Sequence, residues 1–239
     1  MKVLLGKHEL IYPSEDIGEL RDCNDLLDDA ASLHDRMDED GYLLIRNFFD
    51  PEPIQKARRA ILEFGRDEGQ DVFLPETDLM DAVVNPEGRM GRTNGNRKVT
   101  HRPNVLAVLE HQSLFDFFER FFDTPASTFD NKWLRFVKTG GSAGPHYDNV
   151  YMGLGSDRLH TCWIPFGDYT PEDGTLAVLY GSHNLPSFEN VRSKYGRSDV
   201  DRDQTPGHFN SDPVAITETF GGQWQTTHFQ AGDLLILTM

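Results

Sequence analysis

The chain has 239 residues, of which 38% are hydrophobic, and its formal net charge is −16. This acidic balance argues against nonspecific binding to nucleic acid, which requires a basic surface. No apolar run reaches the roughly 18 residues that span a bilayer. Charged residues interrupt the first ten residues too early for a secretory signal. Two cysteines, Cys23 and Cys162, provide no disulfide framework. We therefore expect a cytoplasmic protein without nucleic-acid or membrane partners.

The first half of the chain has the pattern of helices around one short strand. Approximate apolar stripes predict helices over residues 14–40, 51–64 and 113–122. Gly41 is expected to end the first helix. The apolar run 42–49 that follows it is typical of a strand.

The second half has the pattern of a β domain. Short β-rich segments are separated by Gly, Pro, Asp and Asn, which favours a sandwich or barrel over parallel βαβ units. These segments are "KWLRFVKT", "HTCWIPF", "TLAVLY" and "DLLILTM". We predict a mainly β fold with flanking helices in one domain, 1–239. Helices over about 1–125 would buttress a β core over about 126–239.

The segment "GSAGPHYDNVY", residues 141–151, contains the strongest candidate site. On a strand, His146 and Asp148 would share one face, because alternate side chains point the same way. An imidazole and a carboxylate suit a borderline divalent metal, and a second His would complete a facial triad for iron(II). The pair alone is weak evidence, since the same spacing also occurs in surface pairs.

Three elements together resemble the phytanoyl-CoA dioxygenase family of iron(II)- and 2-oxoglutarate-dependent oxygenases. They are the His146–Asp148 pair, "DGTLAVLYGSH" at 173–183, and "AGDLLI" at 231–236. The earlier "DEDGYLLIRNFFDPEPI" at 38–54 is also similar to that family. The resemblance implies a double-stranded β-helix core, a cupin-like jelly roll. It also implies Fe(II), 2-oxoglutarate and O₂, with hydroxylation of a small molecule. Related halogenases have a small residue in place of the carboxylate, so Asp148 favours hydroxylation.

In the family, a second His follows the "GD" strand by about ten residues, and an Arg that binds 2-oxoglutarate follows about ten residues later. We therefore expect the third metal ligand and this Arg to lie beyond Met239, in a protein longer than this chain. His160, His183 and His228 are weaker candidates for the third ligand, because a lone His is more often structural than metal-binding.

Three further residues are candidates for the 2-oxoglutarate pocket. The resemblance places Trp163 where the family often has an aromatic residue lining that pocket; the alternative is a core tryptophan. Alternation puts Lys132, Leu134 and Phe136 on one face, and Leu134 is the family-matched candidate for cosubstrate contact. Tyr147 could hydrogen-bond a carboxylate, or could simply be exposed.

The segment "RMGRTNGNRKVTHRP", residues 89–103, has basic residues and no acid. One hypothesis is a lid in which Arg92 and Arg97 recognise an anionic group of the substrate. The alternative is a mobile, solvated loop, since charge runs are usually at the surface.

Two other functions remain open at this stage. The barrel could bind a small molecule without turnover, because a fold does not imply an activity. It could also be a cupin-like metalloenzyme with another cosubstrate. The sequence contains no signal for the oligomeric state or the identity of the substrate.

Overall fold

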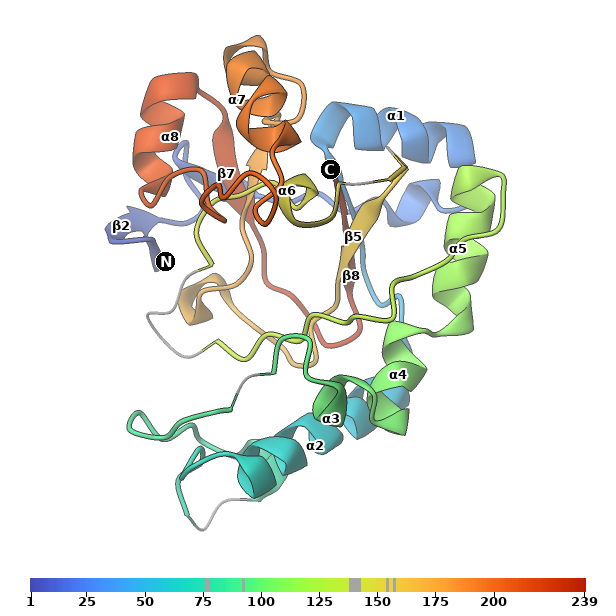
Figure 1. Cartoon of the computed structure of the whole chain (residues 1–239), viewed down its shortest axis with the longest axis vertical. Coiled ribbons are helices and arrows are strands. Elements are labelled where there is room, and N and C mark those ends of the chain that lie inside the picture. The colour runs from blue at the N-terminus through green and yellow to red at the C-terminus, as the bar shows by residue number, and fades with distance from the viewer. Residues whose placement is uncertain (76–77, 92, 138–142, 154, 157) are drawn as a thin grey trace. The chain divides into compact units, whose positions relative to one another are not determined.

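The computed structural model describes residues 1–75, 78–91, 93–137, 143–153, 155–156 and 158–239. They fall into two compact units, Met1–Arg46 with Ser142–Met239, and Asn47–Gly141 (Figure 1). The prediction of a single domain over 1–239 stays a prediction.

The first unit contains two three-stranded sheets and a hairpin. In one sheet, β7 (Gln223–Thr226) pairs in parallel with β3 (Ile17–Glu19) and antiparallel with β6 (Val178–Tyr180). In the other sheet, β8 (Leu234–Thr238) lies between β4 (Tyr42–Ile45) and β5 (His160–Trp163), antiparallel to both. Strands β1 (Lys2–Leu5) and β2 (His8–Ile11) form the hairpin. The predicted strands at 42–49, 160–166, 175–180 and 233–239 are confirmed as shorter segments.

The two three-stranded sheets pack face to face. Tyr42 and Leu44 of β4 form a buried cluster with Leu235 of β8, and Val178 and Tyr180 of β6 pack against it. A row of alternate side chains from each strand can fill such a layer, because successive residues of a strand point to opposite faces. The shared apolar layer therefore holds the two sheets together.

The α-helices of the first unit lie toward one end of these sheets, in the upper part of Figure 1. Helix α1 (Ala30–Asp40) begins after Asp29, whose carboxylate accepts from the amides of Ala31 and Ser32, and it ends at Gly41 with φ +78°. The other helices are short. They are α6 (Asn149–Met152), α7 (Glu189–Ser193), α8 (Pro213–Phe220) and the 3₁₀ turns η1 (Asn24–Leu26), η3 (Pro171–Asp173), η4 (Pro186–Phe188) and η5 (Tyr195–Arg197).

The predicted helix over 14–40 is confirmed only over its last eleven residues. Residues 14–29 instead include strand β3 and turn η1. Ile17 and Leu20 are buried as the stripe suggested, but Ile17 lies opposite Trp224 in β7. Pairing with a strand more than 200 residues away overrides the local pattern, because strand preference depends on packing partners.

The second unit is built around α2 (Pro51–Glu68), whose prediction is confirmed. Pro51 occupies the first turn, where its missing N–H costs nothing. The buried face contains Ile54, Ala57, Ile61 and Phe64, as the spacing predicted. Helix α5 (Gln112–Phe122) confirms the third predicted helix. The remaining elements are η2 (Leu79–Asp81), α3 (Arg97–Thr100) and α4 (Pro103–Leu109), of which α4 packs on α2.

The segment 131–137 forms no strand, contrary to the prediction, although its alternation is present. Lys132 and Leu134 are buried, while Trp133 is 38% exposed. The buried ammonium of Lys132 is compensated by Glu110, 2.9 Å away. The alternating pattern thus predicted which side chains are buried but not the hydrogen-bonded partner that a strand requires.

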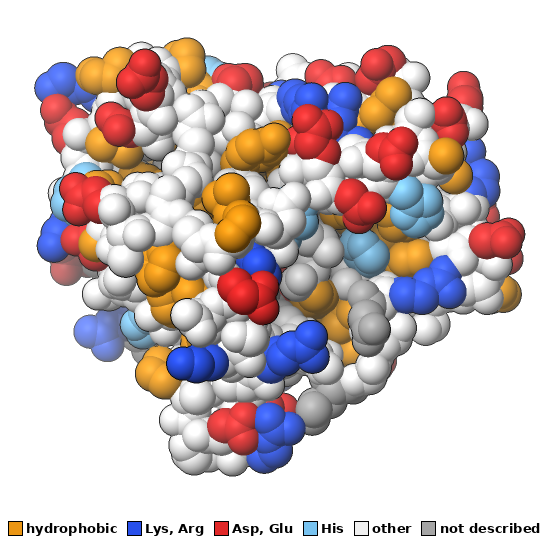
Figure 2. Space-filling model, turned by 90° about the horizontal axis from the view of Figure 1, so that it is seen from above, with side chains coloured by type: hydrophobic (Ala, Val, Ile, Leu, Met, Phe, Trp, Pro, Cys, Tyr) orange, Lys and Arg blue, Asp and Glu red, His pale blue; other side chains and the backbone are white. Residues whose placement is uncertain are grey.

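Helices and several sheets are mixed in the described residues, and helices contain more residues than strands. The prediction of a mainly β chain is corrected accordingly. None of the described helices combines the length and the apolar character needed to cross a bilayer. Acidic side chains occur at many points of the face shown in Figure 2.

Candidate metal site

His146 and Asp148 lie in the loop before α6, rather than on the strand that their spacing suggested. Asp148 has φ −62° and ψ −25°, so the backbone is already helical there and α6 begins at the next residue. The two side chains nevertheless converge. Nε2 of His146 is 3.2 Å from Oδ1 of Asp148, and the two side chains are 16% and 17% exposed.

The ring of His146 is held on two sides. Its Nδ1 lies 2.7 Å from the carbonyl oxygen of Gly144. The ring of Tyr151 meets it edge to face, with centroids 5.5 Å apart. Nδ1–H donates to that carbonyl, so Nε2 is the ring nitrogen directed toward Asp148, which is the orientation that a metal-binding histidine needs.

Both donor atoms of the pair point to one place. With Nδ1–H bonded to Gly144, neutral His146 presents a lone pair to the lone pairs of Asp148, and only an added proton or a cation makes this contact favourable. Two ligand atoms that are each about 2.1 Å from a divalent metal, at right angles, lie about 3 Å apart. The observed 3.2 Å therefore fits two adjacent ligands of one ion.

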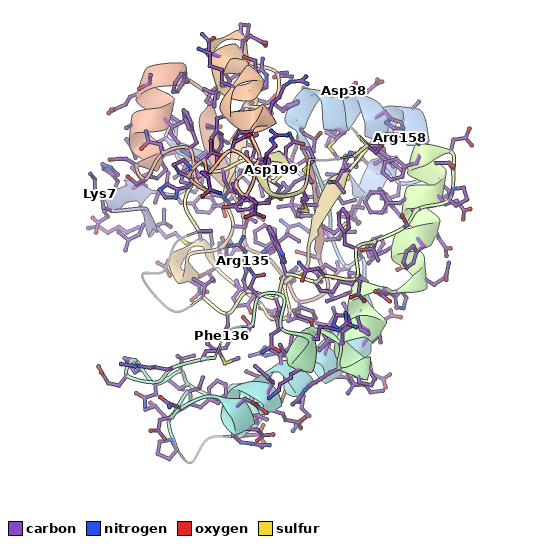
Figure 3. All side chains as sticks on the ribbon, in the orientation of Figure 1. Lys7, Asp38, Arg135, Phe136, Arg158 and Asp199 are labelled. Carbon is purple, nitrogen blue, oxygen red and sulfur yellow. The ribbon has the colours of Figure 1, made fainter. Side chains whose placement is uncertain are left out.

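The loop with the pair is fixed by the segment 195–209. The amide of Val200 donates to the carbonyl of Val150 at 3.0 Å, and the amide of Phe209 donates to the carbonyl of Pro145 at 2.8 Å. Asp199, from the same segment, is labelled next to α6 in Figure 3. These bonds reach the chain on both sides of the pair, so the segment determines where the two ligands lie.

No third ligand is found within the part of the chain that the structure describes, where no three His, Cys, Asp or Glu side chains gather around a possible ion. His183 donates from Nε2 to the carbonyl of Asp38 at 2.8 Å. Nδ1 of His160 lies 3.2 Å from the carbonyl of Arg158, and burial lowers the pKa of His160. His228 is exposed. The weaker candidates therefore belong to no such group.

The sequence model of the phytanoyl-CoA dioxygenase family matches residues 37–236. The chain belongs to the phytanoyl-CoA dioxygenase family. It is also 26% identical over 189 residues to the 1-deoxypentalenic acid 11-beta-hydroxylase of Streptomyces exfoliatus. That alignment covers 74% of this chain and 63% of the hydroxylase, so the chain spans less than two thirds of its relative's length.

The two other family elements have structural roles in this member. Asp173 closes a capping box at η3, where the amide of Thr170 donates to its Oδ2 at 2.7 Å. Asp233 precedes β8 and is completely buried. Its carboxylate accepts from the guanidinium of Arg46 at 2.8 Å and from the amide of Gln230 at 3.0 Å. Asp173 thus stabilises turn η3, and Asp233, the residue before β8, is linked to Arg46, the residue after β4.

The predicted cosubstrate residues have different surroundings. Trp163 is half-buried on β5, and its ring packs against Phe229 with centroids 4.6 Å apart. Tyr147 is not exposed, contrary to the simpler alternative. Its hydroxyl donates to the carbonyl of Ser182 at 3.1 Å, and burial raises its pKa. Leu134 is buried in the second unit.

The basic segment 89–103 is paired with acids of its own unit. Arg97 forms an ion pair with Asp130, and Nζ of Lys98 lies 3.0 Å from Glu68. Hydrogen bonds from His101 and Arg97 lower the pKa of Asp130. Arg92 lies outside the described residues. Part of the predicted loop is helical, since α3 covers Arg97–Thr100.

Sequence reasoning missed the groups that orient the metal pair. Gly144 has φ +69°, and an added Cβ would lie 3.0 Å from Cβ of His208. The glycine beside the pair was a visible signal of an unusual backbone. Tyr151 is only five positions after His146, but no spacing rule predicts an edge-to-face contact across a loop.

Proposed function

We propose that the protein is an iron(II)- and 2-oxoglutarate-dependent oxygenase that hydroxylates a C–H bond of a small molecule. The observation that carries the proposal is the convergence of His146 Nε2 and Asp148 Oδ1 at 3.2 Å. Membership of the phytanoyl-CoA dioxygenase family supports it. The name of the relative, a hydroxylase of a carboxylic acid, supports hydroxylation of an acidic small molecule.

His146 and Asp148 would supply two ligands of the iron, and Gly144 would hold the imidazole through its carbonyl. The bound iron supplies oxidation by O₂, in which 2-oxoglutarate becomes succinate and CO₂ while the substrate gains one oxygen atom. The role of this chain is to present the two donor atoms and to keep their environment partly dry. Low exposure of both side chains strengthens their interaction with a cation.

The proposed core is a double-stranded β-helix, which the two facing three-stranded sheets support. Within it, Trp163 lines the cosubstrate pocket because its ring faces the layer between the sheets. Leu134 remains a proposed contact. Tyr147 contributes at most the face of its ring, since its hydroxyl already bonds the carbonyl of Ser182.

The test measures succinate formed from 2-oxoglutarate by the full-length protein, purified without oxygen and then supplied with Fe(II) and air. We expect succinate only when both Fe(II) and 2-oxoglutarate are present. His183→Ala is the matched control for His146→Ala, because it also removes an imidazole, but one that bonds the backbone carbonyl of Asp38. Mn(II) binding by the same protein, measured by electron paramagnetic resonance, reports on the site independently of turnover.

Two results would count against the proposal. Protein that binds neither Fe(II) nor Mn(II) and forms no succinate would favour a binding protein without turnover. Metal binding at His146 without consumption of 2-oxoglutarate would favour a metalloenzyme with another cosubstrate.

A further inference from the structure

The second unit contains a cavity of about 500 Å³ beside α2. Small-molecule sites commonly have volumes of this order. Its apolar walls come from the segment that follows α2 in the chain, and they consist of Phe73, Leu74, Pro75, Leu79 and Ala82. All the described lining residues belong to Asn47–Gly141, so the cavity is a feature of this unit alone.

The segment that forms the apolar walls is held against α2. Phe73 pairs antiparallel with Val84, so the chain folds back on itself here. The ring of Phe73 approaches α2 at Gly65, where an added Cβ would lie 3.3 Å from Cε2 of the ring. Further along the segment, Nη2 of Arg58 donates to the carbonyl of Met80 at 3.3 Å. The walls are therefore in place without a ligand.

Three charged side chains also line the cavity. Arg59 is exposed, and none of the described residues forms a hydrogen bond or an ion pair with it. Arg66 follows nearly two turns later on the same side of α2. Its Nε donates to Oδ1 of Asp67 at 2.8 Å, which leaves its two Nη groups for a ligand. The third group is Asp78, whose Oδ1 accepts from the amide of Met80 at 2.9 Å. Two cations and one anion leave the lining with one net positive charge.

The apolar walls continue onto the surface of the unit. Leu74, which lines the cavity, is 43% exposed, and its amide donates to the carbonyl of Val83. Val83 and Val84 are themselves 52% and 38% exposed. A ligand with an apolar body would remove part of this surface from water, which is favourable.

We propose that this cavity binds a small carboxylic acid with an apolar body. Arg59 and the Nη groups of Arg66 bind the carboxylate, since a guanidinium matches two carboxylate oxygens. One net positive charge suits a monoanion better than a phosphate monoester, which carries nearly two negative charges. The apolar body lies against Phe73, Leu79 and Ala82. The site goes beyond the proposed oxygenase function, because its lining includes neither His146 nor Asp148.

The test titrates the full-length, metal-free protein with octanoate, octanol and acetate. Octanol has the apolar chain without the charge, and acetate has the charge without the chain. Nuclear magnetic resonance of the methyl groups of Leu79 and Ala82 reports binding at the cavity itself. We expect octanoate to shift both signals and to bind at least about tenfold more tightly than either of the other two ligands.

Three variants test which charges hold the acid. Arg59→Gln should lower the affinity for octanoate about tenfold, the lower end for a hydrogen bond to a charged group, and leave that for octanol within about twofold. Asp78→Asn should raise the affinity for octanoate, because it removes a like charge but keeps an acceptor for the amide of Met80. Arg120→Gln is the matched control, since Arg120 is an exposed arginine of α5 outside the cavity, and it should change neither affinity. Arg59→Gln should melt like the wild type, because Arg59 has no partner to lose among the described residues.

Three results would overturn the inference. Octanoate that shifts neither methyl signal would show that the cavity does not take such a ligand. Equal affinity of wild type and Arg59→Gln for octanoate would contradict the assignment of the carboxylate. Binding to phosphatidylglycerol vesicles that is lost in Arg59→Gln, without binding of octanoate, would replace the free acid by a membrane surface. Because the titration uses metal-free protein, its outcome does not depend on the proposed function.

Discussion

The metal pair and the basic segment 89–103 both stand out in the sequence, but their charged groups have opposite surroundings. In the first, His146 and Asp148 direct their donor atoms at each other, and Nε2 of the imidazole lies 3.2 Å from the carboxylate. In the second, Arg97 and Lys98 are already paired with acids of the same unit.

A bound cation would stabilise the metal pair. The charges of Arg97 and Lys98, by contrast, are already neutralised by ion pairs. A local excess of charge in the sequence does not show whether the charge is available, because partners can come from distant segments. Asp130 is 33 residues from Arg97, and Glu68 is 30 residues from Lys98. Geometry around the donor atoms is therefore the better guide to function.

Removing either member of the metal pair should have the largest effect. We expect His146→Ala and Asp148→Ala to lower Mn(II) affinity by more than about a hundredfold, because loss of an inner ligand exceeds the tenfold to hundredfold loss typical of outer partners. Electron paramagnetic resonance of the full-length protein measures the bound fraction. If both variants bind Mn(II) like the wild type, the pair is not a metal site.

Substitution of Gly144 tests whether the orientation of the imidazole matters. Gly144→Ala places a side chain at φ +69° and against His208, so the carbonyl that accepts from His146 must move. We expect a tenfold to hundredfold loss of Mn(II) affinity, about the size of other outer-partner effects. Gly174→Ala is the matched control, since it has φ +79° and no atom within 4 Å of the added Cβ. Similar losses in both variants would indicate backbone strain alone.

Asp212 already has charged or hydrogen-bonding partners in Lys7 and His8. We therefore expect its charge to affect the stability of the fold and not the proposed metal site. A hydrogen bond from Lys7 is the main cause that lowers its pKa to about 2, with smaller contributions that include the amide of Ala215 and His8. Because the folded pKa is below the unfolded value of about 3.9, the stabilisation is present above pH 4 and is lost as the pH falls toward 2.

Asp212→Asn keeps a residue that caps α8 well but removes the charge. The Tm difference from the wild type, measured by calorimetry, should shrink as the pH falls from about 5 toward 2. A difference that persists unchanged at pH 2 would show that the cap, and not the charge, is responsible.

Neutralising Arg97 should have the smallest effect. Its pair with Asp130 is exposed, at 66% and 71% of the two side chains, so screening by water makes the pair weak. We expect Arg97→Gln to leave the substrate KM within about twofold and to change the free energy of unfolding little. A tenfold rise in KM with unchanged stability would instead support the lid hypothesis.

Several elements of the fold were predictable because their signals are local. Pro51 and the spacing of Ile54, Ala57 and Ile61 predict α2 and its buried face. Gly41 ends α1 in a left-handed conformation, as a terminal glycine commonly does. Residues 14–29 were mispredicted because β3 depends on β7, a distant partner that no local pattern reveals.

The candidate site was predictable in composition but not in geometry. The spacing of His146 and Asp148 correctly placed their side chains together, yet the reason is the start of α6 and not a strand. Tyr147 is covered by Ser182 and Tyr195, residues 35 and more positions away, so its burial could not be foreseen.

Anomalous diffraction from crystals of the full-length protein with Mn(II) tests the central claim most directly. The account predicts one anomalous peak within about 2.3 Å of both Nε2 of His146 and Oδ1 of Asp148, as expected for bonds to a divalent metal. Bound Mn(II) that contacts neither atom, or no peak at a saturating concentration of Mn(II), would contradict it.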